Sequence, residues 1–197
     1  MQSAPSLPYV FTVPLRTDRL TLRLMTADDV DDVYAYQSRE DVCRFMLYEP
    51  RTRDEIVERN AKNALATTLA GDGDYLQLAL ELPATADAPA RVIGDSYFTI
   101  ASVENSHGET GWTMHPDFTG RGYASEAAGA VLGLAFETIG LHRVHAELNP
   151  RNYASIALCK RLGMREEALF VEDLMFKGDW ADTGIYAILQ REWLAGR

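Results

Sequence analysis

Two glycines flank an arginine just before a long apolar segment, within residues 115–136 (HPDFTGRGYASEAAGAVLGLAF). Glycine loses more backbone freedom on folding than other residues, so Gly120 and Gly122 need a local reason. The first amides of a helix lack intrahelical partners and carry a partial positive charge. Without Cβ atoms an anion can approach those amides closely, and Arg121 adds positive charge at the rim. The stretch therefore predicts an anion-binding turn where a helix begins near Tyr123.

Three phosphate-binding motifs compete for this turn. The P-loop string G-x-x-x-x-G-K-[ST] does not occur in the chain. The dinucleotide fingerprint G-x-G-x-x-G has Ser125 where its third glycine belongs, and residues 115–119 separate the turn from the preceding strand. The third motif is the pyrophosphate loop of acyl-CoA-binding proteins. A nicotinamide-dependent enzyme stays as an alternative, which stabilisation by NAD rather than by CoA would reveal.

The charge distribution also favours a local anion site. The 197-residue chain has a net charge of −10, which disfavours nucleic acid as a partner. Residues 121–165, which begin at the glycine turn, nevertheless contain six basic and three acidic residues. An acidic protein therefore carries a locally basic segment at the predicted anion site.

Several other classes of protein are disfavoured by the composition. The two cysteines, Cys43 and Cys159, are too few for a disulfide framework, and the four histidines lack the spacing of a metal site. We expect no metal and two reduced thiols. No apolar run approaches the roughly 20 residues that span a bilayer, and the N-terminus does not resemble a signal peptide. We therefore expect a cytoplasmic protein without a membrane partner.

The hydrophobic periodicity predicts the elements that must position the turn. Prolines in the first 14 residues predict an extended arm over 1–14, followed by one domain over 15–197. We expect helices after Thr26 and over residues 52–70, 123–139 and 152–162, and strands over residues 20–24, 75–82, 91–102, 109–114, 143–148, 164–176 and 183–190. Their order indicates a mixed α/β (α+β) domain with a largely antiparallel sheet.

Four stretches in this order resemble the GNAT superfamily of N-acetyltransferases, and specifically its RimJ/RimL-like branch. They are LRTDRLTLRLMTADD, GETGWTMHPDFTGRGYASEA, LNPRNYASIALCKRLGM and FKGDWADTGIYAIL. The loop motif of that family, Q/R-x-x-G-x-G/A, falls on residues 119–124, with Gly122 and Ala124 matching and Thr119 departing from the usual first position. The resemblance implies the GNAT fold, with a six- to seven-stranded sheet and about four helices.

The resemblance also implies an activity. Such an enzyme moves an acetyl group from acetyl-CoA to a primary amine, either a protein N-terminus or a small cationic amine, by direct attack with help from a general base. A small-molecule or peptide amine is then the partner, and a homodimer is left open. The alternative is a non-catalytic acyl-CoA-binding or sensor module of the same fold.

The resemblance assigns roles to individual residues. Glu109 is the candidate base, although an exposed carboxylate at a strand end would look the same. Asn152 would meet the pantetheine arm and Ser155 the thioester, while Asn152 also reads as a plain helix N-cap. The expected oxyanion donor is a backbone N–H near Met114. The full set expected to bind the cofactor is Met114, His115, Gly120, Arg121, Gly122, Tyr123, Ala124, Ser125, Asn149, Asn152 and Ser155.

Two further expectations concern the leaving group and the acceptor. Cys159 stands where many GNAT enzymes carry a tyrosine that is thought to protonate the leaving thiolate, so Ser155 or water would take that task. The regions expected to form the acceptor groove are acidic, which suits a cationic amine. The acids in question are Asp28, Asp29, Asp31, Asp32, Glu172, Asp173, Asp179 and Asp182.

Overall fold

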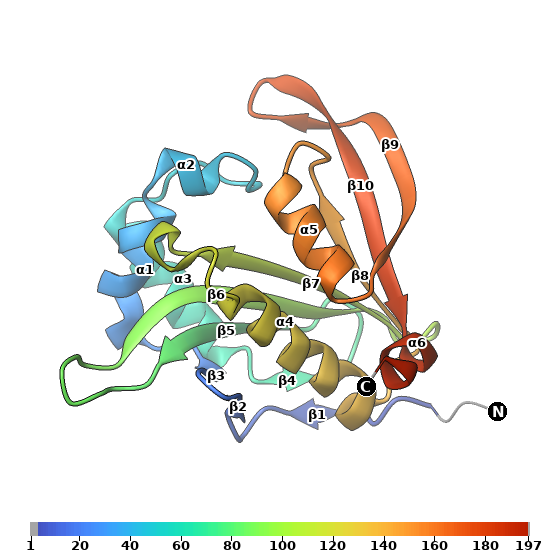
Figure 1. Ribbon diagram of the computed structural model, residues 1–197, viewed down its shortest axis with the longest axis horizontal. Coiled ribbons are helices and arrows are strands. Elements are labelled where there is room, and N and C mark those ends of the chain that lie inside the picture. Colours follow the sequence, from blue (N-terminus) through green and yellow to red (C-terminus); the bar gives the residue numbers. More distant parts are fainter. Residues whose placement is uncertain (1–3, 197) are drawn as a thin grey trace.

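An eight-stranded sheet runs through the protein in the order β2-β3-β5-β6-β7-β8-β10-β9 (Figure 1). The computed structural model describes residues 4–196. All neighbouring strands are antiparallel except β7 and β8, which are parallel. The strands are β2 (Leu15–Arg16), β3 (Thr21–Leu24), β5 (Tyr75–Leu82), β6 (Arg91–Ser102), β7 (His107–Met114), β8 (Arg143–Leu148), β9 (Arg165–Phe176) and β10 (Asp179–Leu189).

Helices cover both faces of this sheet. They are α1 (Val30–Gln37), α2 (Glu40–Cys43), α3 (Arg53–Leu65), α4 (Tyr123–Gly133), α5 (Tyr153–Arg161) and α6 (Gln190–Ala195), and α4 continues as a π-helical segment over Leu134–Ile139. The side chains of β5 alternate between the faces. Leu78 and Leu80 pack in the core cluster that includes α4, whereas Ala79 packs with α1 and α3. Figure 1 shows α4 lying across one face of the sheet.

Strands β7 and β8 pair only at their beginnings. The pairs are His107 with Arg143, Gly108 with Val144 and Glu109 with His145. Beyond Glu109 the two strands diverge, and the edge of β7 that faces β8 has no strand partner among residues 4–196. Since α4 follows β7 and α5 follows β8, the divergence leaves space between the elements that carry the predicted site residues.

Part of the predicted N-terminal arm pairs with the domain. Strand β1 (Tyr9–Val10) pairs antiparallel with β4 (Thr68–Leu69), and Phe11 is buried in the core. Residues 1–3 of the predicted arm, and residue 197 of the predicted domain, lie outside the described residues.

The element order and the mixed, mostly antiparallel sheet are confirmed, and several boundaries differ from the predictions. The helix predicted over residues 52–70 ends at Leu65, because the β-branched Thr67 and Thr68 leave it and Thr68 pairs with β1. The closing hairpin turns at Lys177 and Gly178, both with positive φ, rather than over residues 177–182. Short elements such as β2 and α6 were missed. The main sheet therefore has eight strands instead of the six to seven expected, and the described residues form six α-helices instead of about four.

The close approach of β6 and β7 depends on one glycine. A Cβ atom at Gly94 would lie 2.4 Å from the carbonyl oxygen of Thr113 and 2.9 Å from Sδ of Met114. We predict that Gly94→Ala lowers the free energy of unfolding by about 1–3 kcal/mol, because the backbone of β7 must move. Denaturant titration measures this loss. The matched control is Gly111→Ala, whose Cβ would meet only Tyr97 at 4.0 Å; an equal loss in both variants would contradict the prediction.

Candidate active site

The glycine turn adopts a backbone that favours glycine. Gly120 and Gly122 have φ values of 74° and 83°, in the left-handed region, and Gly122 is the N-cap of α4. No heavy atom lies within 4 Å of where a Cβ of Gly120 would stand. The backbone at the start of α4 is therefore bare and open, as an anion-binding turn requires.

A charged cluster holds this turn from the side of the N-terminal strands. Arg19 donates from Nη1 to the carbonyl oxygen of Arg121 at 2.9 Å and from Nε to Oε2 of Glu126 at 2.7 Å. The carboxylate of Glu126 also accepts from the amide of Arg19 at 2.8 Å and from the hydroxyl of Thr17 at 2.5 Å. The guanidinium of Arg19 lies 4.4 Å from the ring centroid of Tyr123. The turn is thus fixed by contacts to residues about 100 positions earlier.

A cavity of about 650 Å³ extends from the glycine turn along the divergent part of β7, and we call it the loop cavity. Arg161, at the end of α5, lines it and donates from Nε to Oγ of Ser125 at 3.2 Å. A guanidinium therefore stands beside the bare backbone of the turn. The lining includes Trp112, Thr113, Met114, Phe118, Gly120, Gly122, Tyr123, Ala124, Ser125, Asn152, Ser155, Leu158 and Arg161.

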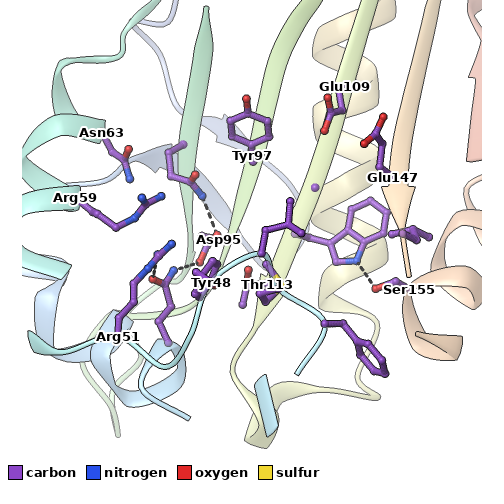
Figure 2. Close-up of a pocket in the computed structure, with 18 of the residues that line it drawn as sticks. Tyr48, Arg51, Arg59, Asn63, Asp95, Tyr97, Glu109, Thr113, Glu147 and Ser155 are labelled. Carbon is purple, nitrogen blue, oxygen red and sulfur yellow. Dashed lines mark hydrogen bonds between the residues drawn. The ribbon is translucent and has the colours of Figure 1, made fainter. Parts of the chain in front are cut away.

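A second cavity of about 430 Å³ contains the carboxylates of Glu109 and Glu147, and we call it the carboxylate cavity (Figure 2). It shares Trp112, Thr113, Asn152 and Ser155 with the loop cavity. At this boundary the indole N–H of Trp112 donates to Oγ of Ser155 at 3.2 Å, which joins β7 to α5 across the gap between the strands. A group that reaches this boundary from either cavity meets the same side chains.

The segment between α2 and α3 covers both cavities. Phe45 and Met46 line the two of them. The ammonium of Lys177, at the turn of the β9–β10 hairpin, donates to the carbonyl oxygen of Cys43 at 2.8 Å and lies 3.3 Å from the carboxylate of Glu49. The closing hairpin thereby holds the cover in place over the site.

Glu109 sits in an environment that disfavours its charged form. Burial raises the pKa of its carboxyl above the ordinary value, and repulsion from Glu147 raises the pKa further. The nearest group able to carry a positive charge is His145, whose Nε2 lies 4.0 Å from Glu109 and 3.8 Å from Glu147. Burial lowers the pKa of His145, so it does not supply that charge at neutral pH. Glu109 is therefore a more basic carboxylate than an exposed one.

The floor of the carboxylate cavity contains a buried carboxylate, Asp95 of β6. Its oxygens accept from the hydroxyl of Tyr36 at 2.6 Å and from the amide groups of Gln37 and Gln77 at 2.9 and 2.8 Å. Burial raises the pKa of Asp95. These bonds connect α1, β5 and β6, so they fix the wall of the cavity.

The sequence matches a family model described as "Acetyltransferase (GNAT) domain" over residues 19–165. This span includes the glycine turn, β7, β8, all of α5 and the segment that covers both cavities. The chain belongs to the GNAT family. The predicted resemblance is thereby confirmed, and the relatives of the chain are N-acetyltransferases by name.

Two curated relatives illustrate the match. The N-acetyltransferase YnaD of Bacillus subtilis (strain 168), itself uncharacterised, is 34% identical over 179 residues, which cover 91% of this chain and 98% of that protein. The ribosomal protein uS5 alanine N-acetyltransferase of Escherichia coli (strain K12) is 30% identical over 87 residues, or 44% of this chain and 45% of that protein. This second relative gives the expected RimJ/RimL-like branch partial support.

Solved structures confirm the GNAT fold. A GNAT-family acetyltransferase from Bacillus anthracis superposes with a TM-score of 0.79 and 27% identity, covering 91% of this chain and 99% of its own. The spermidine N-acetyltransferase of Vibrio cholerae, solved with CoA and spermine, gives a TM-score of 0.74 and 21% identity over 90% of this chain and 99% of its own. Together with the family model, these likenesses identify the chain as a GNAT N-acetyltransferase, as predicted.

The loop cavity gathers most of the residues that the GNAT resemblance assigned to the cofactor. Met114, Gly120, Gly122, Tyr123, Ala124, Ser125, Asn152 and Ser155 line it. Three others lie elsewhere. Arg121 is exposed at the rim and Asn149 lines the carboxylate cavity, whereas His115 is buried, with its ring between those of Tyr36 and Phe118. His115 therefore faces the core, where its Nδ1 accepts from the amide of Asp117.

The residues proposed for the reaction are also placed. Glu109 and Ser155 both line the carboxylate cavity, and Asn152 caps α5 by accepting from the amide of Ser155 at 3.2 Å. Cys159 is fully buried and lines neither cavity, and burial raises its pKa to about 12. The thiol thus packs as a small apolar group in the core.

The acids expected to make the acceptor groove suit a cationic amine lie away from both cavities. None of the eight lines either cavity. Asp29 is buried against Arg23, Asp32 accepts from the amide of Val92, and Asp182 accepts from the amide of Glu172. These eight residues therefore do not build an acidic groove at either cavity, and Asp29, Asp32 and Asp182 make structural contacts instead.

Several residues of the site were not found by sequence reasoning. Asp95 had a signal, since an acid in the middle of the apolar strand RVIGDSYFTI predicts a buried polar network. The others in the site are Tyr48, Arg51, Arg59, Trp112, Glu147 and Arg161, and nothing in their local sequence marks them. They meet only through the tertiary fold.

Among residues 4–196 there is no helix with the length and apolar character needed to cross a membrane. The same residues contain no group of three or more His, Cys, Asp or Glu side chains placed to hold a metal ion.

We predict that Glu109→Gln raises the melting temperature slightly at pH 7–8. Because the pKa of Glu109 is raised in the folded protein, its ionisation lowers the free energy of unfolding. This loss is fully present above the raised pKa and disappears below the ordinary carboxyl pKa. The gain should therefore shrink as the pH falls toward 4. Thermal unfolding across this pH range measures it, and Glu58→Gln on the exposed side of α3 serves as the control. A lower melting temperature for Glu109→Gln at pH 8 would contradict the assignment.

Proposed function

We propose that this protein transfers an acetyl group from acetyl-CoA to a primary amine, by direct attack of the amine with Glu109 as the general base. The observation that carries this proposal is the meeting of two cavities at Trp112 and Ser155. One cavity starts at a bare helix N-terminus that suits a pyrophosphate, and the other contains a carboxylate of raised pKa.

The residues of the loop cavity fit acetyl-CoA. The amides at the start of α4, with Arg161 beside Ser125, would hold the pyrophosphate. The unpaired edge of β7 and the side chain of Asn152 would accompany the pantetheine arm toward Ser155. Acetyl-CoA supplies the thioester, and the chain supplies position and protons.

The reaction requires three proton movements: the ammonium loses one proton before attack, the new amide nitrogen loses a second to solvent, and the leaving thiolate gains one. A primary amine is mostly protonated at neutral pH, so Glu109 must first accept a proton from it, directly or through water. The amine nitrogen then forms a C–N bond to the acetyl carbon as the C–S bond breaks, and a backbone N–H near Met114 would stabilise the oxyanion. The thiolate that leaves takes a proton from Ser155 or water, because Cys159 lies outside both cavities.

A first test concerns the glycine turn. We predict that Gly122→Val weakens binding of CoA at least tenfold, because the added side chain stands over the amides of the turn. The control is Gly140→Val at the other end of the same helical segment, where φ is 82° and no atom lies within 4 Å of the added Cβ. Both variants carry similar backbone strain, and a Cβ at position 122 would also lie 3.3 Å from Nη2 of Arg19, so the melting temperature should fall at least as far in Gly122→Val. Calorimetric titration with CoA distinguishes them, and equal CoA affinity in both would overturn this role of the turn.

A second test concerns Glu109. We predict that Glu109→Gln lowers turnover by about 10²–10⁴-fold while CoA affinity is unchanged, since only proton removal is lost. In the unsubstituted protein, turnover should decrease as the pH falls through the pKa of Glu109, because Glu109 must be ionised. That pKa lies above the ordinary carboxyl value. Release of free thiol over a panel of amines measures both. Full turnover in the variant would remove Glu109 from the mechanism.

A further inference from the structure

Two arginines face the carboxylate cavity from the same side. Arg51 belongs to the segment before α3, and Arg59 lies on α3. Figure 2 shows both guanidinium groups directed toward the centre of the cavity. Among residues 4–196 no carboxylate lies within 4.0 Å of either guanidinium group, and Arg59 makes no side-chain hydrogen bond. Two positive charges therefore share one cavity, and neither forms an ion pair with a carboxylate of the described residues.

The fold holds Arg51 in place although its position costs free energy. Its Nη1 donates to Oε1 of Gln37 at 2.5 Å, and its Cζ lies 3.5 Å from the ring centroid of Tyr48. Burial and the charge of Arg59 both lower the pKa of Arg51. The buried hydroxyl of Tyr48 has no hydrogen bond of good geometry within the described chain. Among residues 4–196, the hydroxyl of Tyr48 and the guanidinium of Arg59 are thus left without a hydrogen-bond partner.

Asp95 does not neutralise the arginine pair. Its two oxygens already accept from Tyr36, Gln37 and Gln77, and it forms no ion pair within 4.0 Å with Arg51 or Arg59. One buried carboxylate faces two guanidinium groups. This side of the cavity is therefore net positive, and its free donors suit an oxyanion.

The opposite side of the cavity is negative. Glu109 and Glu147 lie there, across Tyr97 from the arginines in Figure 2. An amine attracted to Glu109 would place the remainder of a small acceptor near Arg51 and Arg59. A second ammonium group, as in a polyamine, would be repelled at that point. A carboxylate or phosphate would instead meet two guanidinium forks that match its geometry.

We infer that the acceptor is a small primary amine that also carries an anionic oxyacid group, a carboxylate or a phosphate. Arg51 and Arg59 bind the anion, with Tyr48 able to donate to it, while Glu109 faces the amine. This inference rests on the proposed acetyl transfer and names its substrate class. It replaces the cationic acceptor that the acidic composition had suggested.

The experiment compares amines that share a carbon skeleton and differ in the anion, with each rate expressed per unprotonated amine. The matched pairs are an L-amino acid with its amide, and O-phosphoethanolamine with ethanolamine, and spermidine is added as a polycation. Initial rates of CoA release give kcat/KM for each amine. We expect the anionic member of at least one pair to be preferred, and the preferred pair distinguishes carboxylate from phosphate. Preference for spermidine or for the neutral members would overturn the inference.

Variants then locate the preference. Arg51→Gln and Arg59→Gln should each lower kcat/KM for the anionic amine by roughly 10- to 100-fold, mainly through KM, with little change for the neutral member. Lys62→Gln, one turn further along α3 and outside the cavity, is the control. Arg59→Gln should keep or raise the melting temperature, since it removes a repulsion. An unchanged preference in both arginine variants would overturn the inference.

A binding measurement separates this inference from the proposed function. Thermal shifts are recorded with CoA alone and with CoA plus each amine, so that no turnover is needed. If CoA stabilises the protein but no anionic amine adds a shift that the arginine variants lose, the acceptor assignment fails alone. If CoA itself neither binds nor is released from acetyl-CoA, the proposed acetyl transfer fails.

Discussion

The site depends on the divergence of two parallel strands. After three residue pairs, β7 and β8 separate. In the chain, α4 follows β7 and α5 follows β8. Had the strands paired along their full length, Trp112 and Ser155 would have no gap to bridge, and the two cavities would not exist. On the outer sides, β6 pairs antiparallel with β7 and β10 pairs antiparallel with β8. Both pairings extend along β7 and β8, so they hold the separated strands in place.

Buried polar groups give the site its shape and its chemistry at the same time. Asp95 satisfies three donors from α1 and β5, so removing it would leave those donors unpaired in the core. Glu109, by contrast, accepts no side-chain hydrogen bond among residues 4–196, and burial together with repulsion from Glu147 raises its pKa. Two carboxylates from neighbouring strands thus serve different purposes. The hydrogen-bonded Asp95 fixes the wall of the cavity, whereas Glu109, which has no such donors, is the more basic group that faces the cavity.

The sequence was most informative where a local backbone requirement had to be met. Gly120 and Gly122 need positive φ, Asn152 caps a helix, and alternating leucines mark strands, so these features could be predicted from a few neighbouring residues. The arginine side of the carboxylate cavity could not be predicted in this way. Arg51, Arg59 and Asp95 come from three separate elements, and whether a charged residue faces solvent, an ion-pair partner or a cavity is decided by the tertiary fold. The same reason explains why the eight acids were misassigned to the acceptor groove: the sequence did not show that their side chains lie away from both cavities.

The contacts between Arg19 and the glycine turn tie the conformation of that turn to the N-terminal strands. Because Arg19 binds the carbonyl of Arg121 and the carboxylate of Glu126, the turn takes its shape as the N-terminal strands dock onto α4. The conformational entropy of the turn is therefore lost during folding and does not subtract from ligand affinity. Binding of an anion at the turn would therefore be coupled to the docking of the N-terminal strands, through contacts between residues about 100 positions apart.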